Sequence, residues 1–400
     1  MPYLCSVKNE KLILYLITFM WFCAIVDFLL MLPLGTAFMK LYKISPQQYS
    51  MLIAAFSLAG FLSSFTASFY VDKLDRKVVY IAAFAMFAVG TTLCSFANTF
   101  ELMLFSRFFT GLFGGLLGGV STAIISDIVP YERRGKAMGI LNLGFGVASI
   151  VGIPFSIFIY KHSDIFWPFR LVGILSFITL IPAYIILPNL TGHINKETKT
   201  FSEITEILKN RNLQKALLFA FLLVLGHFMF ISFINPYLID NLGFKEEDTM
   251  WMYIVGGISV TLTSPRIGKF IDTLGKLKSF RILILLSFIP ILVITHLQSA
   301  SIMLALLICA FMFIFNSGRM IAAMTLITGA PTEEQRGKFL VIRSSLIELS
   351  EGAAAIIGGM IITQNATTQR LENYNIVGYV AVGIGILCIY LANKIEVNGE

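Results

Sequence analysis

Apolar residues gather in long runs along the chain, and charged or turn-rich breaks separate the runs. A helix needs about 20 apolar residues to cross a bilayer, and twelve runs reach roughly that length. They lie near 12–34, 50–71, 78–98, 102–126, 137–160, 167–187, 213–239, 250–270, 280–297, 301–327, 339–363 and 374–392. The pattern predicts an all-α membrane protein with twelve transmembrane helices.

One long polar stretch, 188–212, divides the runs into two sets of six. We therefore expect an N-terminal six-helix half over 1–190, a linker over 191–212 and a C-terminal six-helix half over 213–400. Within the linker, Phe201–Leu208 has the pattern of a short amphipathic helix. The linker can be a simple tether or a regulatory element.

The composition excludes a water-soluble protein. Apolar residues make up 57% of the chain and charged residues 13%, whereas soluble proteins carry about 25% charged residues. The net charge of +7 does not indicate a nucleic-acid partner, because the basic residues fall mostly in alternate loops and no stretch combines a basic face with stacking aromatics. Of the loop Lys and Arg residues, 20 lie on one side and 6 on the other. The richer side is expected in the cytoplasm, which places both termini there.

Two loop signatures recur in both halves. The loop Tyr70–Lys77 after the second run resembles Gly268–Lys278 after the eighth. The loop Pro130–Lys136 after the fourth run resembles Pro331–Lys338 after the tenth. Two unrelated signatures at nearly one offset indicate duplicated, pseudo-symmetric halves, which is a transporter architecture.

These loops resemble those of major facilitator superfamily transporters. In that family the loop after the second helix reads Gly-x-x-x-Asp-(Arg/Lys)-x-Gly-(Arg/Lys)-(Arg/Lys). Here Asp72 and the basic positions match, Ser68 and Asp75 replace the glycines, and the second copy keeps them as Gly268 and Gly275. The resemblance implies the major facilitator fold and alternating access without a cofactor.

Within the superfamily the chain most resembles the bacterial drug:proton antiporter branch, especially the arabinose-efflux-permease-like exporters. The segments that carry this likeness are Asp27–Gly35, Asp72–Lys77, Val151–Pro154, Tyr253–Gly257, Ser264–Pro265 and Ser317–Arg319. Antiporters usually have a Gly-Pro pair and then a glycine pair in the fifth helix, but here Ala148 and Ser149 replace the first and only Gly152 remains of the second. The resemblance implies export, and the departure in the fifth helix leaves uptake as the alternative direction.

Three carboxylates within the runs are candidates for proton coupling: Asp27, Glu348 and Glu351. A charge at membrane depth costs about 2.5–3.5 kcal/mol on insertion scales, and desolvation favours the protonated form of a carboxyl. Alternatively, Asp27 accepts a hydrogen bond between packed helices, or it lines the cavity and binds substrate without carrying the coupled proton. Glu348 and Glu351 share a helical face and can instead pair with Arg343 or Arg319, or bind a cationic substrate.

A second set of side chains is expected to line the substrate cavity. Arg107 and Arg319 occupy equivalent helices of the two halves, where each can neutralise a carboxylate, hold an anionic substrate or form a fixed ion pair. The other expected cavity residues are polar or aromatic: Asn142, His227, Asn235, Tyr237, Tyr253 and Asn316. Each alone also suits an interhelical hydrogen bond.

The resemblance further implies a cytoplasmic gate in which loop charges clasp the two halves together. Its candidate residues are Asp72, Arg76, Arg134, Asp272 and Arg336. The same charges also help to set the topology. Arg343 is expected at the cytoplasmic end as a further gate charge.

Enzymatic function is not expected, because the sequence shows neither a catalytic constellation nor a metal-ligand cluster. The glycine run Gly111–Gly119 lacks the Lys-Ser/Thr that completes a phosphate loop. We therefore expect a multi-pass transporter of a bacterial inner membrane that acts as a monomer and exports small amphipathic or drug-like molecules against protons. Uptake of a nutrient or metabolite, or a non-transporting sensor, are the alternatives.

Overall fold

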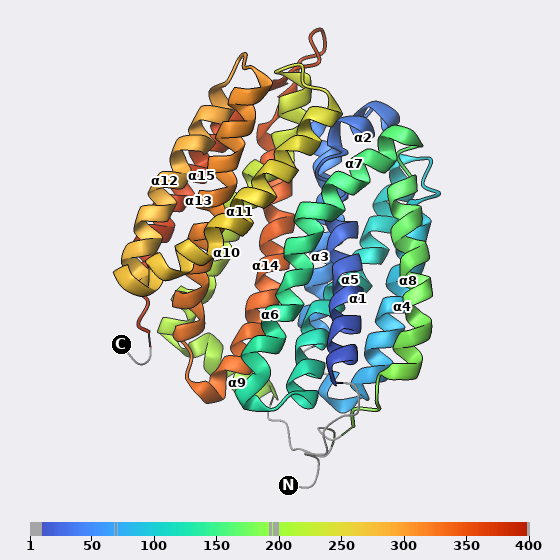
Figure 1. Ribbon diagram of the computed structural model, residues 1–400, viewed down its shortest axis with the longest axis vertical. Helices are drawn as coiled ribbons and strands as arrows, with labels where there is room; N and C mark the ends of the chain where they lie inside the picture. Colours follow the sequence, from blue (N-terminus) through green and yellow to red (C-terminus); the bar gives the residue numbers. More distant parts are fainter. Residues whose placement is uncertain (1–9, 68, 70, 192–193, 195–199, 398–400) are drawn as a thin grey trace.

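The computed structural model describes residues 10–67, 69, 71–191, 194 and 200–397. Its helices run roughly side by side as one bundle, with the N-terminal half on one side and the C-terminal half on the other (Figure 1). All twelve predicted apolar runs are helical, which confirms the expected fold. We call the end of the bundle with loops 71–75 and 129–130 the basic face, and the end with the β-hairpin the far face.

The N-terminal half begins with α1 and ends with α8. Its elements are α1 (Glu10–Leu29), α2 (Gly35–Tyr42), α3 (Pro46–Ala67), η1 (Val71–Lys73), α4 (Arg76–Cys94), α5 (Phe100–Ile128), α6 (Tyr131–Val147), η2 (Ala148–Gly152), α7 (Ile153–His162) and α8 (Trp167–Ile186). The first predicted run therefore contains a break after Leu29, and α2 caps the far face as a separate short helix.

The C-terminal half begins after a helix in the linker. Its elements are α9 (Thr200–Lys209), α10 (Arg211–Asp240), α11 (Glu246–Leu274), α12 (Lys276–His296), α13 (Ile302–Gly329), α14 (Glu333–Ile361), β1 (Thr363–Gln364), β2 (Leu371–Glu372) and α15 (Tyr374–Ala392). The predicted amphipathic helix at Phe201–Leu208 is α9. Strands β1 and β2 pair antiparallel and form the hairpin of the far face.

Two membrane helices are more polar than the rest. Among the described residues, ten helices are long and apolar enough to cross a membrane by length and composition, whereas α11 and α14 are not among them. Both pack against the other half, α14 against α3 and α11 against α7 and η2. Their polar residues therefore coincide with the interface between the halves.

The fifth predicted run bends through a π-helical turn. Proline lacks a backbone N–H and clashes with the carbonyl four residues earlier, so it disturbs an α-helical ladder. Pro154 follows directly on η2, where the hydrogen bonds change to the wider π pattern. Gly152 in this turn lets α1 pack closely, because any larger residue would bring a Cβ within 2.7 Å of the Val26 side chain.

Glycines let α5 pack directly on α3. A Cβ on Gly111 would lie 2.2 Å from the carbonyl oxygen of Phe56, and one on Gly115 would lie 2.4 Å from the Cα of Gly60. Both distances are too short for real atoms. Small residues at such spacing allow close helix contacts in membranes, and here they fix α3 as the wall of a central cavity.

Candidate functional site

A cavity of about 400 Å³ lies between the two halves. Helices α1, α3, α5 and α6 line it from the N-terminal half, and α14 lines it from the C-terminal half. The lining extends to Val71 and Lys338, which belong to segments at the basic face. The cavity thus reaches from the middle of the bundle toward the basic face.

Most of the cavity wall is apolar. Trp21, Phe28, Phe56 and Phe145 supply aromatic rings, and glycines of α5 supply backbone. Polar contributions come mainly from small hydroxyl groups such as Ser57. Such a wall suits a ligand with a large apolar surface and a few polar groups.

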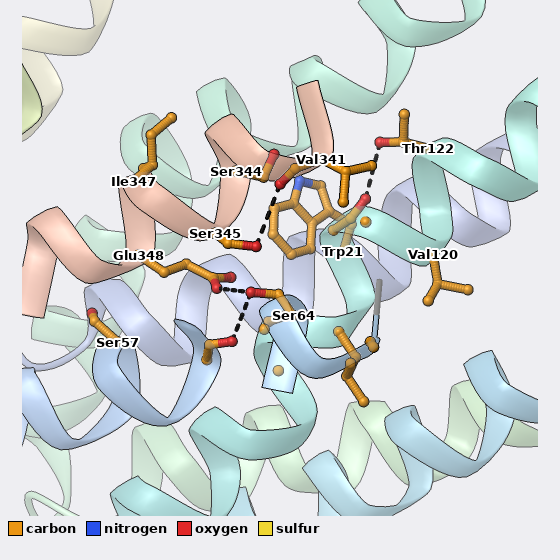
Figure 2. A pocket seen from close by; sticks show the side chains of 18 of the residues that line it. Trp21, Ser57, Ser64, Val120, Thr122, Val341, Ser344, Ser345, Ile347 and Glu348 are labelled. Carbon is orange, nitrogen blue, oxygen red and sulfur yellow. Dashed lines mark hydrogen bonds between the residues drawn. The ribbon is translucent and has the colours of Figure 1, made fainter. Parts of the chain in front are cut away.

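Glu348 and Glu351 are the acidic side chains that line the described cavity. Both lie on α14, and a hydrogen bond joins Glu348 Oε2 to Ser64 Oγ of α3 with an oxygen–oxygen distance of 2.5 Å (Figure 2). Neither carboxylate lies within 4 Å of a Lys or Arg nitrogen of any described residue. The expected alternative, a salt bridge to Arg343 or Arg319, is therefore not formed in this conformation.

Asp27 forms a fully buried ion pair with Arg107. The Nη1 of Arg107 lies 2.6 Å from Asp27 Oδ2 and 3.3 Å from the Asp27 carbonyl oxygen. Both side chains are 0% exposed. The sequence marked each residue separately as a candidate, and the structure brings them together inside the N-terminal half.

Aromatic rings separate this ion pair from the cavity. The guanidinium of Arg107 lies 4.5 Å from the centre of the Phe56 ring, at cation–π distance. Phe56 also contacts Phe28, with ring centres 5.4 Å apart, and both rings line the cavity. The Asp27–Arg107 pair therefore lies directly behind the cavity wall and outside the cavity itself.

The polar residues expected in the cavity from the C-terminal half lie elsewhere in this conformation. Asn235, Tyr253 and Asn316 are buried, and so is Arg319, which donates to Ser287 at 3.1 Å. The lining of the described cavity includes none of them, nor Tyr237 or His227.

Two of these side chains have other neighbours. The Tyr237 hydroxyl donates to the Leu297 carbonyl at 2.7 Å, and the His227 ring lies 5.6 Å from the Phe228 ring, centre to centre. Asn142 lies on α6, and its side chain is outside the described part of the structure. Substrate contact by this set stays a prediction.

The candidate gate residues lie at the basic face. Arg76 pairs with Asp127 at 2.5 Å, and Arg134 donates to the carbonyls of Ser126 and Val129, all within the N-terminal half. Asp272 and Arg336 are exposed on α11 and α14, and neither forms an ion pair with a described residue. Asp72 lies in η1, with its side chain outside the described part. Gating by this set also stays a prediction.

Polar contacts join the halves at the far face. The hydroxyl of Thr36 in α2 lies 3.5 Å from Asp240 Oδ2 in α10. Between α7 and α11, Lys161 pairs with Glu247 at 2.6 Å and Tyr160 donates to Glu246 at 3.3 Å. The bundle is therefore tied together at the far face while its cavity extends toward the basic face.

The sequence analysis did not identify Ser64 as a functional candidate. A usable signal was present, since Ser57, Gly60 and Ser64 repeat at helical spacing and put a small, polar stripe on one face of α3. The two glutamates give α14 a polar stripe as well. Pairing two such stripes requires knowledge of which helices meet, and the sequence pattern does not supply it.

Membrane-spanning helices in two halves around a central cavity form the architecture of a secondary transporter. The model of the Major Facilitator Superfamily matches the chain over residues 16–318 and again over 216–395. The chain belongs to this family. It is a membrane transporter and not an enzyme.

Relatives with exporter names cover most of the chain. A protein of Helicobacter acinonychis (strain Sheeba), "Probable sugar efflux transporter", is 23% identical over 359 residues, which are 90% of this chain and 88% of that protein. "Multidrug resistance protein 2" of Bacillus subtilis (strain 168) is 22% identical over 401 residues, covering 97% of this chain and 98% of that protein. The first name states efflux for that protein, and the second states multidrug resistance.

Solved structures share the fold at low identity. A bacterial homolog of the human lysosomal transporter Spinster, in an inward-facing and occupied conformation, superposes with a TM-score of 0.76 at 14% identity and covers 97% of both chains. The nucleoside transporter NupG gives a TM-score of 0.73 at 15% identity over 97% of this chain and 99% of its own. These likenesses establish the fold.

Proposed function

We propose that the protein is a proton-coupled exporter of small amphipathic molecules that works by alternating access. One observation carries this proposal: Glu348 and Glu351 line an apolar cavity between the halves without a Lys or Arg within 4 Å among the described residues. An unpaired charge in such surroundings is costly. The carboxylates therefore favour either a bound proton or a bound cationic group.

Competition for the two carboxylates couples the flux of substrate to the flux of protons. A substrate with a positive group displaces the proton, and a proton that enters from the other side displaces the substrate. Exchange of one proton for one singly charged cation moves no net charge, so the pH difference drives it. One pH unit is worth about 1.4 kcal/mol, which corresponds to roughly tenfold accumulation.

The direction and location rest on relatives and charge distribution. Both relatives are bacterial proteins, one named for sugar efflux and one for multidrug resistance, and these names support export across the inner membrane of a bacterium. The excess of Lys and Arg on the basic face places that face in the cytoplasm. The far-face contacts then close the outside, and the cavity is loaded from the cytoplasm.

Transport by the purified full-length protein in liposomes tests the proposal. With an acidic lumen, an antiporter accumulates a lipophilic cation inside the liposomes while protons leave. We expect Glu351→Gln, and more strongly Glu348→Gln together with Glu351→Gln, to abolish most of this accumulation, a loss of about tenfold for a gradient of about one pH unit. Glu372→Gln in the exposed hairpin is the matched control and should transport normally.

Three other outcomes of the liposome assay would contradict parts of the proposal. Accumulation that requires an acidic exterior instead would indicate symport and hence uptake. Normal proton-driven accumulation in the double variant would remove the two glutamates from coupling. No proton-dependent flux with any amphipathic cation would count against transport of this class.

A further inference from the structure

A chain of hydrogen bonds links the two halves beside the cavity. Ser64 of α3 and Glu348 of α14 contact each other across the interface, with 2.5 Å between Oγ and Oε2. The same Oγ lies 2.8 Å from the carbonyl oxygen of Gly60, one turn earlier in α3. Figure 2 shows the Glu348 side chain reaching from α14 to Ser64 along the cavity wall. No role has been assigned to Ser64 so far.

The count of hydrogens limits how this chain can be arranged. A serine hydroxyl has one hydrogen to donate and lone pairs to accept. A carboxylate and a carbonyl are both acceptors, so an ionised Glu348 would leave one of the two contacts without a hydrogen. If Glu348 is protonated, its O–H donates to Ser64 Oγ, and Ser64 donates to the Gly60 carbonyl. Every contact then has one hydrogen.

The local helix supports this direction. Donation from a Ser or Thr hydroxyl to the carbonyl one turn back is a common helical pattern, and in α3 Thr66 donates in this way to Leu62 at 2.7 Å. Ser63 also reaches the Gly60 carbonyl, at 3.0 Å. The rival arrangement has Ser64 donating to an ionised Glu348. It leaves a half-buried negative charge in an apolar wall without a Lys or Arg within 4 Å among the described residues, and such a charge is costly.

We propose that Ser64 is a positioning residue that holds a proton on Glu348 while the cavity faces the cytoplasm. The inference rests on the proposed function, since it assigns the stored proton to one of the two coupling carboxylates. Gly60 makes the contact possible, because a Cβ there would lie 3.3 Å from the Glu348 carboxyl carbon. The carboxyl group therefore lies directly over the backbone of α3.

The charged groups around Glu348 agree with a neutral acid. Glu351, one turn away on α14, is a second acid and supplies no positive charge. Lys338 lies on α14 in the lining that reaches the basic face, and α10 behind α14 carries His227. Helices α1, α3, α5 and α6 contribute no charged side chain to the described lining. Among the described residues, no Lys or Arg nitrogen lies within 4 Å of the Glu348 carboxyl group to oppose a proton there.

The Ser64–Glu348 contact crosses the interface between the halves, so relative motion of the halves can break it. Ser64 belongs to one half and Glu348 to the other, so a motion that separates α3 from α14 at this level removes the acceptor of the Glu348 proton. The proton is then released or must find a new partner. Among the described residues, no hydrogen bond joins Glu351 to α3, so Glu351 remains available to the substrate.

Difference infrared spectroscopy of the full-length protein in lipid tests this arrangement without any transport. A titration should show the carbonyl stretch of a protonated carboxyl group that is absent in Glu348→Gln. Removing the acceptor in Ser64→Ala should move the midpoint of that band to lower pH by about 0.5–1 unit, the worth of one neutral hydrogen bond. Ser64→Thr keeps a hydroxyl and should keep the midpoint. Ser57→Ala, also on the α3 side of the cavity, is the matched control.

The sign of the shift decides between the two arrangements. A midpoint that rises in Ser64→Ala would show that Ser64 donates to an ionised carboxylate, and an unchanged midpoint would show that it does neither; both overturn the proposal. The transport assay is independent of this outcome. If the band shifts as expected while Glu348→Gln still transports normally, the proton site stands and the coupling role of Glu348 fails.

Discussion

At the scale of single residues, the Asp27–Arg107 pair is the most isolated charged contact described here. Both side chains are 0% exposed and one oxygen–nitrogen distance is 2.6 Å. Desolvating two ions is costly, and their attraction offsets that cost only while both are present. Removing one partner therefore leaves a buried charge with nothing to neutralise it.

We expect Asp27→Asn to lower the free energy of unfolding by about 3–5 kcal/mol, because Arg107 then stays charged and unpaired. Asp27→Asn combined with Arg107→Gln removes both charges and should recover most of the loss. The midpoint of thermal unfolding in detergent measures this. Asp164→Asn breaks the partly exposed pair with Arg170 and should cost at most about 1 kcal/mol.

The same variants test whether Asp27 couples transport to protons or only stabilises the fold. Normal proton-driven transport by the double variant would show that Asp27 is a structural residue only. Loss of transport in a variant that remains folded would support its predicted role in proton coupling.

The sequence identified the ions of this site but not their arrangement. Asp27, Arg107 and the two glutamates stand out because charge is rare in apolar runs. Asp27 and Arg107 are far apart in the chain, however, and their pairing depends on how α1 and α5 turn toward each other. Ser64 carries no charge and becomes visible only through its contact with Glu348.

At the scale of elements, the bilayer makes the helices predictable, since each span must supply its own backbone hydrogen bonds and an apolar surface. The runs at 250–270 and 339–363 form helices α11 and α14, although both helices are comparatively polar. Irregular features escaped prediction for local reasons. The break between α1 and α2 lies inside an apolar run, and the π turn depends on how Pro154 disturbs the preceding ladder.

Helix packing gives a prediction at this scale. Gly111→Ala should force α5 away from α3 and lower stability by about 1–3 kcal/mol, as overpacking does, because its Cβ would lie 2.2 Å from the Phe56 carbonyl oxygen. Gly119→Ala on the same helix meets nothing within 4 Å and should stabilise slightly. Thermal unfolding of the two variants makes the comparison, and equal midpoints would contradict the packing described here.

At the scale of the whole molecule, the two ends of the interface between the halves differ. The far face is joined by Thr36–Asp240 and by the α7–α11 contacts of Lys161 and Glu247, whereas the cavity lining reaches the basic face. The Lys161–Glu247 pair is about half exposed, 45% and 49%. Exposed pairs contribute at most about 1 kcal/mol, so this pair adds little to the stability of the closed far face.

A covalent lock tests whether that opening is needed. Cysteines at 36 and 240, joined by a disulfide bond or a short bifunctional reagent, should stop transport by holding the far face closed. Cleaving a disulfide lock with a reductant should restore it. The single variants Thr36→Cys and Asp240→Cys, treated in the same way, are the controls. Undiminished transport in the locked protein would argue against alternating access through this face.

The linker helix α9 belongs mechanically to one half. Ile207 is buried in the core of the C-terminal half, and Glu206 accepts from Gln335 of α14 at 3.4 Å. The residues after α8 belong to the N-terminal half, because the Leu190 N–H donates to Asp75 Oδ1 at 3.0 Å and the Leu190 carbonyl accepts from the Arg76 N–H at 3.4 Å. The described parts of the linker are thus divided between the two halves. The fold thus behaves as a non-covalent heterodimer within one polypeptide, in which helix interfaces, rather than the covalent connection, determine how the halves move.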